Sequence, residues 1–88
     1  MADKEYSQII VNRILSLKHS RGLSIRKLAE MSGINHSTLE SLIEGKSQNP
    51  TIKTLHKIAI AFGMTPAEFL DFKEFSEYSF EDETDEDE

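Results

Sequence analysis

The 88-residue sequence contains no cysteine, so neither a disulfide framework nor a thiolate metal site can supplement its hydrophobic core. No apolar run approaches the ~18 residues of a membrane span, and the acidic start MADKEY lacks the basic and apolar regions of a signal peptide. At this length the chain forms one small domain, which argues against a large catalytic cleft. These absences predict a cytoplasmic protein that has no membrane partner.

Basic residues are missing from the C-terminal end of the chain. Residues 74–88 hold nine of the sixteen acids and no Lys or Arg, and they dominate the net charge of −6. The body has the opposite balance, since residues 1–73 carry a net charge of +3 and residues 13–57, with eight bases and three acids, carry +5. This asymmetry favours a polyanion as the partner of the body. We expect residues 74–88 to form an acidic, disordered tail, because such a polar segment cannot bury a core.

Helical periodicity is the main structural signal that the sequence does contain. Ile10, Ile14 and Leu17 recur at the spacing of one helix face, which predicts a helix over about residues 6–20. No stretch alternates between apolar and polar residues as a strand would, and no repeat of about 20 to 50 residues is visible. The sequence therefore predicts an all-α fold of five short helices within residues 1–73.

Capping residues delimit the four later helices. The second is expected over about residues 25–32 after Ser24, and the third over about residues 36–44 after Asn35. Both stretches precede a glycine, which commonly ends a helix. These two helices are short and lie next to each other in the chain.

Two further helices follow Pro50, which disfavours helical backbone at the residue before it. The fourth is expected from near Thr51 until just before the next glycine. The fifth has a clear start, because Thr65, Pro66 and Glu68 fit an N-cap, a proline in the first helical position and a capping box. The expected core residues of these two helices are Leu55, Ile58, Ala59, Phe62, Phe69 and Leu70.

The second and third predicted helices have the layout of a helix-turn-helix, in which one helix enters the DNA major groove and the other braces it. Ala29 is small where the two helices cross, Gly33 permits a positive φ in the turn, and Leu39 and Leu42 fix the crossing angle. The outward positions of residues 36–44 carry mostly short hydrogen-bonding side chains, whereas a merely solvated helix favours Lys, Glu, Gln and Arg. We interpret this polar face as a surface that contacts DNA.

The stretch over residues 22–70 resembles the Cro/CI-type helix-turn-helix of phage repressors and many small bacterial regulators, usually called the Xre family. It reads GLSIRKLAEMSGINHSTLESLIEGKSQNPTIKTLHKIAIAFGMTPAEFL, and its segments SIRKLA and NPTIKTL are an especially close match. The resemblance implies a five-helix, lambda-repressor-like domain in residues 1–73 that binds double-stranded DNA, with the motif at 25–44. It also implies a homodimer, most simply a repressor that occupies a palindromic operator.

Carried over position by position, the resemblance assigns base reading to the helix after the turn. Short side chains let a helix approach base edges, a histidine can donate to guanine or to a phosphate, and serine and threonine can pair with either base type. The base-reading positions hold Asn35, His36, Ser37 and Ser41, with Thr38 and Glu40 as secondary candidates. The phosphate-contacting positions hold Ser24, Arg26, Lys27, Lys46, Gln48, Asn49, Thr51 and Lys53. The pattern is broken at two places, since many relatives have Gln in place of Ile25 and Glu in place of Ile43.

Catalysis and metal binding are weaker interpretations of the same residues. His19, His36 and His56 are separated by 17 and 20 residues, which fits no helical pair of metal ligands, so we expect no metal or cofactor. A hydrolase built from Ser37, His36 and Glu40 would lack a nucleophile elbow and an oxyanion loop. We therefore expect no enzymatic activity.

The aromatic C-terminal end leaves more than one role open. Phe69, Phe72 and Phe75 are the expected apolar contact between the two copies of a homodimer. Phe69 is also an expected core residue, and Phe72 and Phe75 could instead pack in the core or anchor the tail. The alternative function is a protein-interaction module, antitoxin-like or a scaffold, whose acidic aromatic tail binds a protein partner.

Overall fold

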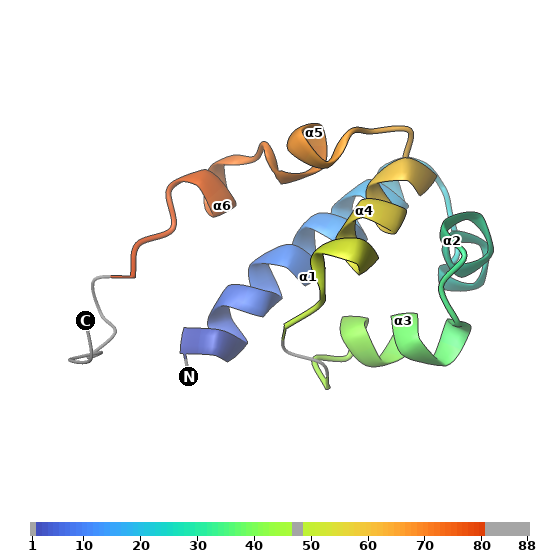
Figure 1. The fold of residues 1–88 in the computed structure, drawn as a ribbon, viewed down its shortest axis with the longest axis horizontal. Coiled ribbons are helices and arrows are strands. Elements are labelled where there is room, and N and C mark those ends of the chain that lie inside the picture. The colour runs from blue at the N-terminus through green and yellow to red at the C-terminus, as the bar shows by residue number, and fades with distance from the viewer. Residues whose placement is uncertain (1, 47–48, 81–88) are drawn as a thin grey trace.

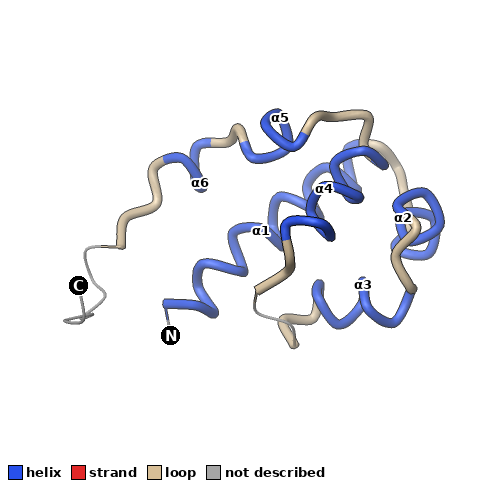
Figure 2. Tube along the Cα trace, in the orientation of Figure 1, coloured by secondary structure: helices blue, strands red, loops and turns tan. Residues whose placement is uncertain are grey.

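The computed structural model describes residues 2–46 and 49–80, and this part of the chain forms six helices without a strand (Figure 1). Short turns and loops join the helices (Figure 2). The predicted all-α class is therefore confirmed. The helices are α1 (Ala2–Ser20), α2 (Ile25–Ser32), α3 (His36–Ile43), α4 (Ile52–Ala61), α5 (Pro66–Leu70) and α6 (Lys73–Ser76).

Side-chain caps fix the starts of several helices. Ser24 Oγ accepts a hydrogen bond from the Lys27 N–H at 3.0 Å, and Asn35 caps α3 in a similar way. At α5 the capping box is complete, because Glu68 N–H donates to Thr65 Oγ1 at 3.0 Å and Thr65 N–H donates to Glu68 Oε1 at 2.9 Å. Each contact satisfies an N–H group that has no partner within its own helix. The predicted starts of α2, α3 and α5 are confirmed.

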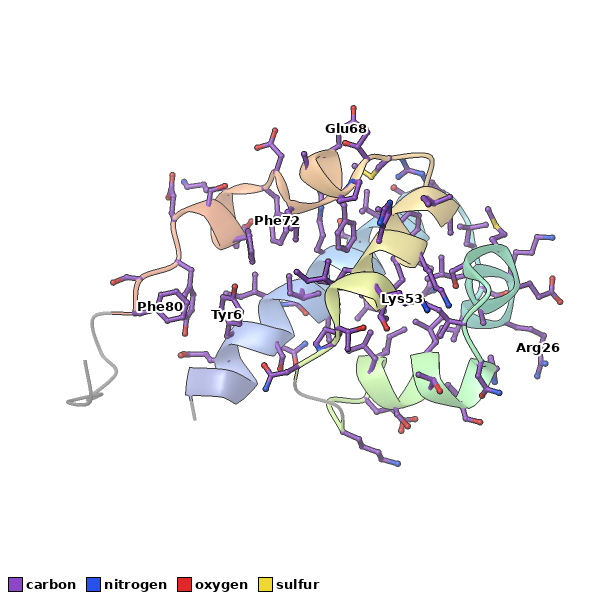
Figure 3. All side chains as sticks on the ribbon, viewed as in Figure 1. Tyr6, Arg26, Lys53, Glu68, Phe72 and Phe80 are labelled. Carbon is purple, nitrogen blue, oxygen red and sulfur yellow. The ribbon has the colours of Figure 1, made fainter. Side chains whose placement is uncertain are left out.

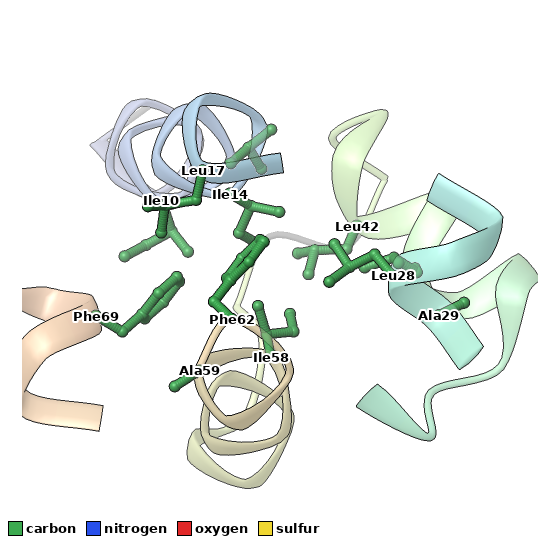
Figure 4. Packing of buried hydrophobic residues seen from close by; sticks show 12 residues of the cluster. Ile10, Ile14, Leu17, Leu28, Ala29, Leu42, Ile58, Ala59, Phe62 and Phe69 are labelled. Atoms are coloured by element: carbon green, nitrogen blue, oxygen red, sulfur yellow. The ribbon is translucent and has the colours of Figure 1, made fainter. Parts of the chain in front are cut away.

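Apolar side chains from α1 to α5 meet in one core, where Phe62 lies between α1 and α4 (Figure 4). Burying one such side chain contributes roughly 1.5–3 kcal/mol. Leu55 and Leu70 were expected in this core, but each is only half-buried and packs against its edge. The buried apolar residues are Ile10, Val11, Ile14, Leu17, Leu28, Ala29, Leu39, Leu42, Ile58, Ala59, Phe62 and Phe69.

Helix α1 begins at Ala2, earlier than the predicted start near residue 6. The first residues of the helix carry no apolar stripe, so periodicity could not detect them, although most of them tolerate helical backbone well. The start of α1 is also held from outside the helix. Tyr6, in its second turn, packs against aromatic residues from the other end of the chain.

The sixth helix, α6, is missing from the five-helix prediction and spans the predicted boundary between residues 73 and 74. The ring centroid of Tyr6 lies 5.9 Å from that of Phe75, 5.2 Å from that of Tyr78 and 5.4 Å from that of Phe80. Such separations suit tilted and edge-to-face aromatic pairs, which stabilise a fold beyond simple burial. Together with Phe72, which stacks on Phe75 at 5.7 Å, these residues form what we call the aromatic cluster (Figure 3). Residues 81–88 of the predicted tail lie outside the described residues.

Arg13 fastens the end of α5 to α1. Its Nε donates to the Phe69 carbonyl at 2.9 Å and its Nη2 donates to the Glu68 carbonyl at 3.1 Å. The guanidinium also lies 4.9 Å from the centre of the Phe72 ring, within the range of a cation–π contact. Carbonyls in the last turn of a helix have no partner within the helix, and here an arginine supplies one. Arg13 is therefore occupied inside the fold, although it belongs to the basic segment 13–57.

Candidate nucleic-acid interface

The turn between α2 and α3 has the geometry that the sequence predicted. Gly33 adopts φ +72°, a left-handed conformation that costs a residue with a Cβ roughly 1–2 kcal/mol. Its N–H donates to the Glu30 carbonyl at 3.3 Å, and the Ile34 N–H donates to the Ala29 carbonyl at 3.1 Å. This pair of bonds is a Schellman motif, which ends α2 and sets the direction of the chain into α3.

Helix α3 has one buried side and one polar side. Leu39 and Leu42 are 0% and 3% exposed and lock the helix onto the core. Three polar side chains, those of Ser37, Thr38 and Glu40, are exposed. His36 and Ser41 are half-buried at the margins of the same surface. A helix held rigidly by its inner face can present its outer side chains in a fixed register, as base reading requires.

Two of the predicted base-reading residues have neighbours within the chain. The Oδ1 atom of Asn35 accepts a hydrogen bond from the Ser37 N–H at 2.9 Å, so only the amide N–H groups of Asn35 remain to donate elsewhere. His36 Nδ1 lies 3.9 Å from Glu40 Oε1, one turn further along α3. The other ring nitrogen of His36, Nε2, takes no part in that contact.

Two hollows flank α3, and each is lined by several of the predicted DNA-contact residues. A shallow hollow of about 430 Å³ at the start of the helix is lined in part by Arg26, Asn35 and His36. A smaller one of about 130 Å³ between α3 and α4 is lined in part by Thr38, Asn49 and Thr51. Residues predicted to read bases and residues predicted to contact phosphates therefore lie side by side. Gln48, also predicted to contact phosphate, lies outside the described residues.

The Lys and Arg side chains predicted to contact phosphate are exposed. Lys27 Nζ lies 3.9 Å from Glu30, and Lys46 Nζ lies 3.2 Å from Glu44. Exposed ion pairs of this kind are worth about 0–1 kcal/mol, so a phosphate can compete for either lysine at little cost. Arg26 is likewise exposed on α2, and Lys53 is exposed on α4 (Figure 3).

Glu44 is a candidate that sequence reasoning missed. It lies one turn after Glu40 and is exposed at the end of α3. The spacing of four residues between the two glutamates would have revealed it. A carboxylate can accept a hydrogen bond from the cytosine amino group and repels phosphate, so Glu44 joins Glu40 as a candidate whose role remains a prediction.

The two departures from the resembled pattern have a structural explanation. Ile25 and Ile43 are partly buried and pack against the core, where a polar side chain would be poorly accommodated. The start of α2 therefore contributes packing at the position of Ile25. Ser24, which caps α2, and the exposed basic side chains of Arg26 and Lys27 remain available to DNA.

One residue of the predicted dimer contact, Phe69, lies in the core, as the helical pattern also predicted. Phe69 is 0% exposed, so its side chain cannot reach a second copy. It points inward because α5 is a single short turn packed directly over the core. Phe72 and Phe75 are half-buried, and their rings contact each other and, respectively, Arg13 and Tyr6.

The described residues contain neither a membrane-spanning helix nor a cluster of metal-ligating side chains. None of the helices in this part of the chain is long and apolar enough to cross a membrane. Residues 2–46 and 49–80 contain no group of three or more His, Asp or Glu side chains that could hold a metal ion.

The chain belongs to the Cro/C1-type helix-turn-helix DNA-binding domain family, whose model matches residues 13–74. It is 38% identical over 58 residues to the HTH-type transcriptional regulator PuuR of Escherichia coli strain K12. The matched segment covers 66% of this chain and 31% of PuuR. It is 31% identical over 70 residues to the HTH-type transcriptional regulator SinR of Bacillus subtilis strain 168. The matched segment covers 80% of this chain and 63% of SinR.

A solved structure shares the fold over most of its length. The crystal structure of the prophage Lp1 protein 11 superposes with a TM-score of 0.73 and 29% identity, covering 82% of this chain and 95% of the other. The predicted family and fold are thus confirmed. The present chain nevertheless spans only about a third of the length of PuuR.

Proposed function

We propose that this protein is a sequence-specific regulator of transcription that binds double-stranded DNA through α3. One observation carries the proposal: α3 buries Leu39 and Leu42 in the core while its opposite side presents short hydrogen-bonding groups. The geometry of the turn at Gly33 supports it, as does membership of a DNA-binding domain family. An α-helix of this kind fits the major groove, where each base pair shows a distinct pattern of donors and acceptors.

The residue roles in this proposal are those that the family resemblance assigns. His36, Ser37 and Ser41 are the main base readers in this proposal, and Asn35 contributes its amide N–H groups. Thr38 and Glu40 lie at the border and adjust the preference. The phosphate contacts come from Ser24, Arg26, Lys27, Lys46, Gln48, Asn49, Thr51 and Lys53.

The regulator acts, in this proposal, as a homodimer on a palindromic operator and represses by occupying a promoter in the cytoplasm. A single α3 reads only a few base pairs, so specificity in a genome requires two copies on half-sites about 34–36 Å apart. PuuR and SinR, both named as transcriptional regulators, support the regulatory role. The chain performs no catalysis in this scheme.

The proposal is tested by selecting bound sequences from a random duplex pool. A palindromic consensus is the expected result, and retention of unrelated sequences at equal affinity would overturn base reading. The salt dependence provides a second measurement, because neutralising Z phosphates gives a log-log slope of about −0.9Z.

A second candidate function is supported by the aromatic cluster. Phe80 is 53% exposed at the edge of this cluster and directly precedes the acidic residues 81–88. An apolar ring beside acidic residues offers a protein partner both an apolar and a charged contact. Binding through that surface would depend on salt much less steeply than binding to DNA, so the same titration separates the two functions.

A further inference from the structure

A cavity between α1 and the C-terminal segment lies apart from the proposed DNA surface. Its volume is about 270 Å³, and we call it the α1–α6 cavity. In Figure 1, α6 lies along the upper edge of the molecule and α3 along the lower edge, so an occupant of the cavity would leave α3 uncovered. The residues that line the cavity are Ile9, Asn12, Arg13, Ser16, Phe72 and Glu74.

Contacts within the chain hold both walls of the α1–α6 cavity in place. The four lining residues of α1 are spaced i, i+3, i+4 and i+7, so they share one face of the helix. On the opposite wall, the Phe72 ring centroid lies 4.9 Å from the guanidinium carbon of Arg13 and 5.7 Å from the ring centroid of Phe75. Phe75 in turn packs against Tyr6. The cavity is therefore formed before any molecule enters it, as sites for small ligands usually are.

Two opposite charges line the α1–α6 cavity without pairing with each other. None of the ion pairs that the described residues form within 4.0 Å includes Arg13 or Glu74. Arg13 uses its Nε and Nη2 atoms to bind the carbonyls at the end of α5, and its Nη1 atom takes part in neither hydrogen bond. A molecule that carries one negative and one positive group can therefore contact both side chains at once.

The neutral polar side chains of the cavity favour a negative group on the side of α1. Asn12 Oδ1 accepts a hydrogen bond from Gln8 Nε2 at 2.9 Å, so the amide N–H groups of Asn12 remain to donate. The hydroxyl of Ser16 is a further donor on the same face of α1. The carboxylate of Glu74 belongs to α6 and can only accept when it is ionised. The cavity thus has donors on one wall and an acidic acceptor on the other.

We propose that the α1–α6 cavity binds a small zwitterion, namely a free α-amino acid with an apolar side chain. The carboxylate of the ligand accepts from Arg13 Nη1 and from Asn12, and its ammonium group meets Glu74. Its apolar side chain packs against Ile9 and Phe72, which are both half-buried. The volume of about 270 Å³ is just below the roughly 300–1,000 Å³ of sites for drug-sized ligands, which suits a smaller molecule. This inference does not rest on the proposed function, because it concerns a different surface.

Titration of the isotope-labelled chain with L-leucine, followed by NMR in the absence of DNA, tests the site directly. The backbone amide signals of the residues that line the cavity should shift at millimolar leucine, whereas the signals of α3 should not. Glycine, which has no apolar side chain, should bind more weakly. Isocaproate, the analogue of leucine that lacks the amino group, should also bind more weakly. If millimolar leucine shifts no signal of the cavity, or if glycine binds as tightly as leucine, the proposal is wrong.

Two matched charge variants separate a direct contact from a general effect on the fold. Glu74→Gln removes the carboxylate of the cavity, and Glu77→Gln removes an exposed carboxylate at the end of the same helix but outside the cavity. The wild type should prefer L-leucine to isocaproate by about 5-fold, the size of an exposed charge pair. Glu74→Gln should abolish this preference, and Glu77→Gln should retain it. If Glu74→Gln keeps the wild-type preference, Glu74 does not contact the ammonium group and the proposed zwitterion site is wrong.

Discussion

Arg13 and Arg26 have the same side chain and opposite uses. Arg13 donates to two carbonyls at the end of α5 and lies over Phe72, whereas Arg26 is exposed beside the hollow at the start of α3. Lys18 resembles Arg13 in this respect, since its Nζ donates to the Leu23 carbonyl at 3.2 Å. A count of basic residues therefore overstates the charge that a DNA backbone would meet. In the proposed function, only Lys and Arg residues that follow α1 in the sequence contribute to the DNA-binding surface.

The polar side of α3 and the aromatic cluster show the same contrast on a larger scale. Both stand out in the sequence by residue type. In the structure the polar side of α3 is exposed, whereas much of the aromatic cluster is in contact with Tyr6. The following predictions test whether these two regions are divided between binding and stability in this way.

The largest expected effect concerns the two sides of α3. Leu39→Ala removes a fully buried side chain and should lower the free energy of unfolding by about 2–5 kcal/mol. Ser37→Ala, on the exposed side, should change it by less than about 0.5 kcal/mol. Urea denaturation followed by circular dichroism measures both values. Equal losses would show that the outer side of α3 is also structural.

The next effect separates the two arginines. Arg13→Met should lower the free energy of unfolding by roughly 1.5–3 kcal/mol, because it removes two charge-assisted hydrogen bonds to carbonyls. Arg26→Met should leave stability within about 0.5 kcal/mol of wild type and reduce the salt slope of DNA binding by about 1. If Arg26→Met lowers the free energy of unfolding more than Arg13→Met does, the assignment of Arg13 to stability and Arg26 to DNA binding is wrong.

Base readers and phosphate contacts should differ in a third comparison. His36→Ala and Ser41→Ala should each change the preference at one or two base pairs per half-site, at a cost of ~1 to 3 kcal/mol for a direct contact. Lys46→Ala should weaken binding to all sequences alike. Competition binding against single-base variants of the selected site gives the measurement, and wild-type preference in the first two variants would remove α3 from base reading.

The smallest expected effect concerns the acidic residues 81–88. Replacing their Asp and Glu with Asn and Gln, while keeping Phe75 and Phe80, should tighten binding to random duplex at low salt without changing the preferred sequence. Eight residues extend at most ~29 Å, and screening limits each charge to ~8–10 Å at moderate salt. The longest dimension of the molecule is 42 Å, so only part of the DNA surface lies within reach. Unchanged affinity for random duplex would show that these acids do not act as an electrostatic brake.

Local signals made the helix-turn-helix predictable. The caps at Ser24 and Asn35 and the turn at Gly33 act within a few residues of each other, so the sequence alone indicates where α2 and α3 start and how the turn between them is built. The buried and exposed sides of α3 follow from helical spacing for the same reason. The exposure of Glu44 was available from that spacing as well.

Long-range contacts were not predictable in this way. The hydrogen bond from Arg13 to the Phe69 carbonyl joins residues 56 positions apart in the sequence, and no local pattern near either residue predicts it. The contacts that residues 75–80 make with Tyr6 are long-range in the same way, since the two segments lie at opposite ends of the chain. These features arise from tertiary packing, which periodicity does not record.

The aromatic cluster also determines where the molecule can be extended. Tyr6 and Phe80 lie together at one end of the protein, and Arg26 lies at the opposite end (Figure 3). A reporter or a further domain joined through either of these neighbouring segments would project away from α2 and α3. The architecture is thus compatible with modular fusion, in which an added part would leave the proposed DNA-reading side of α3 accessible.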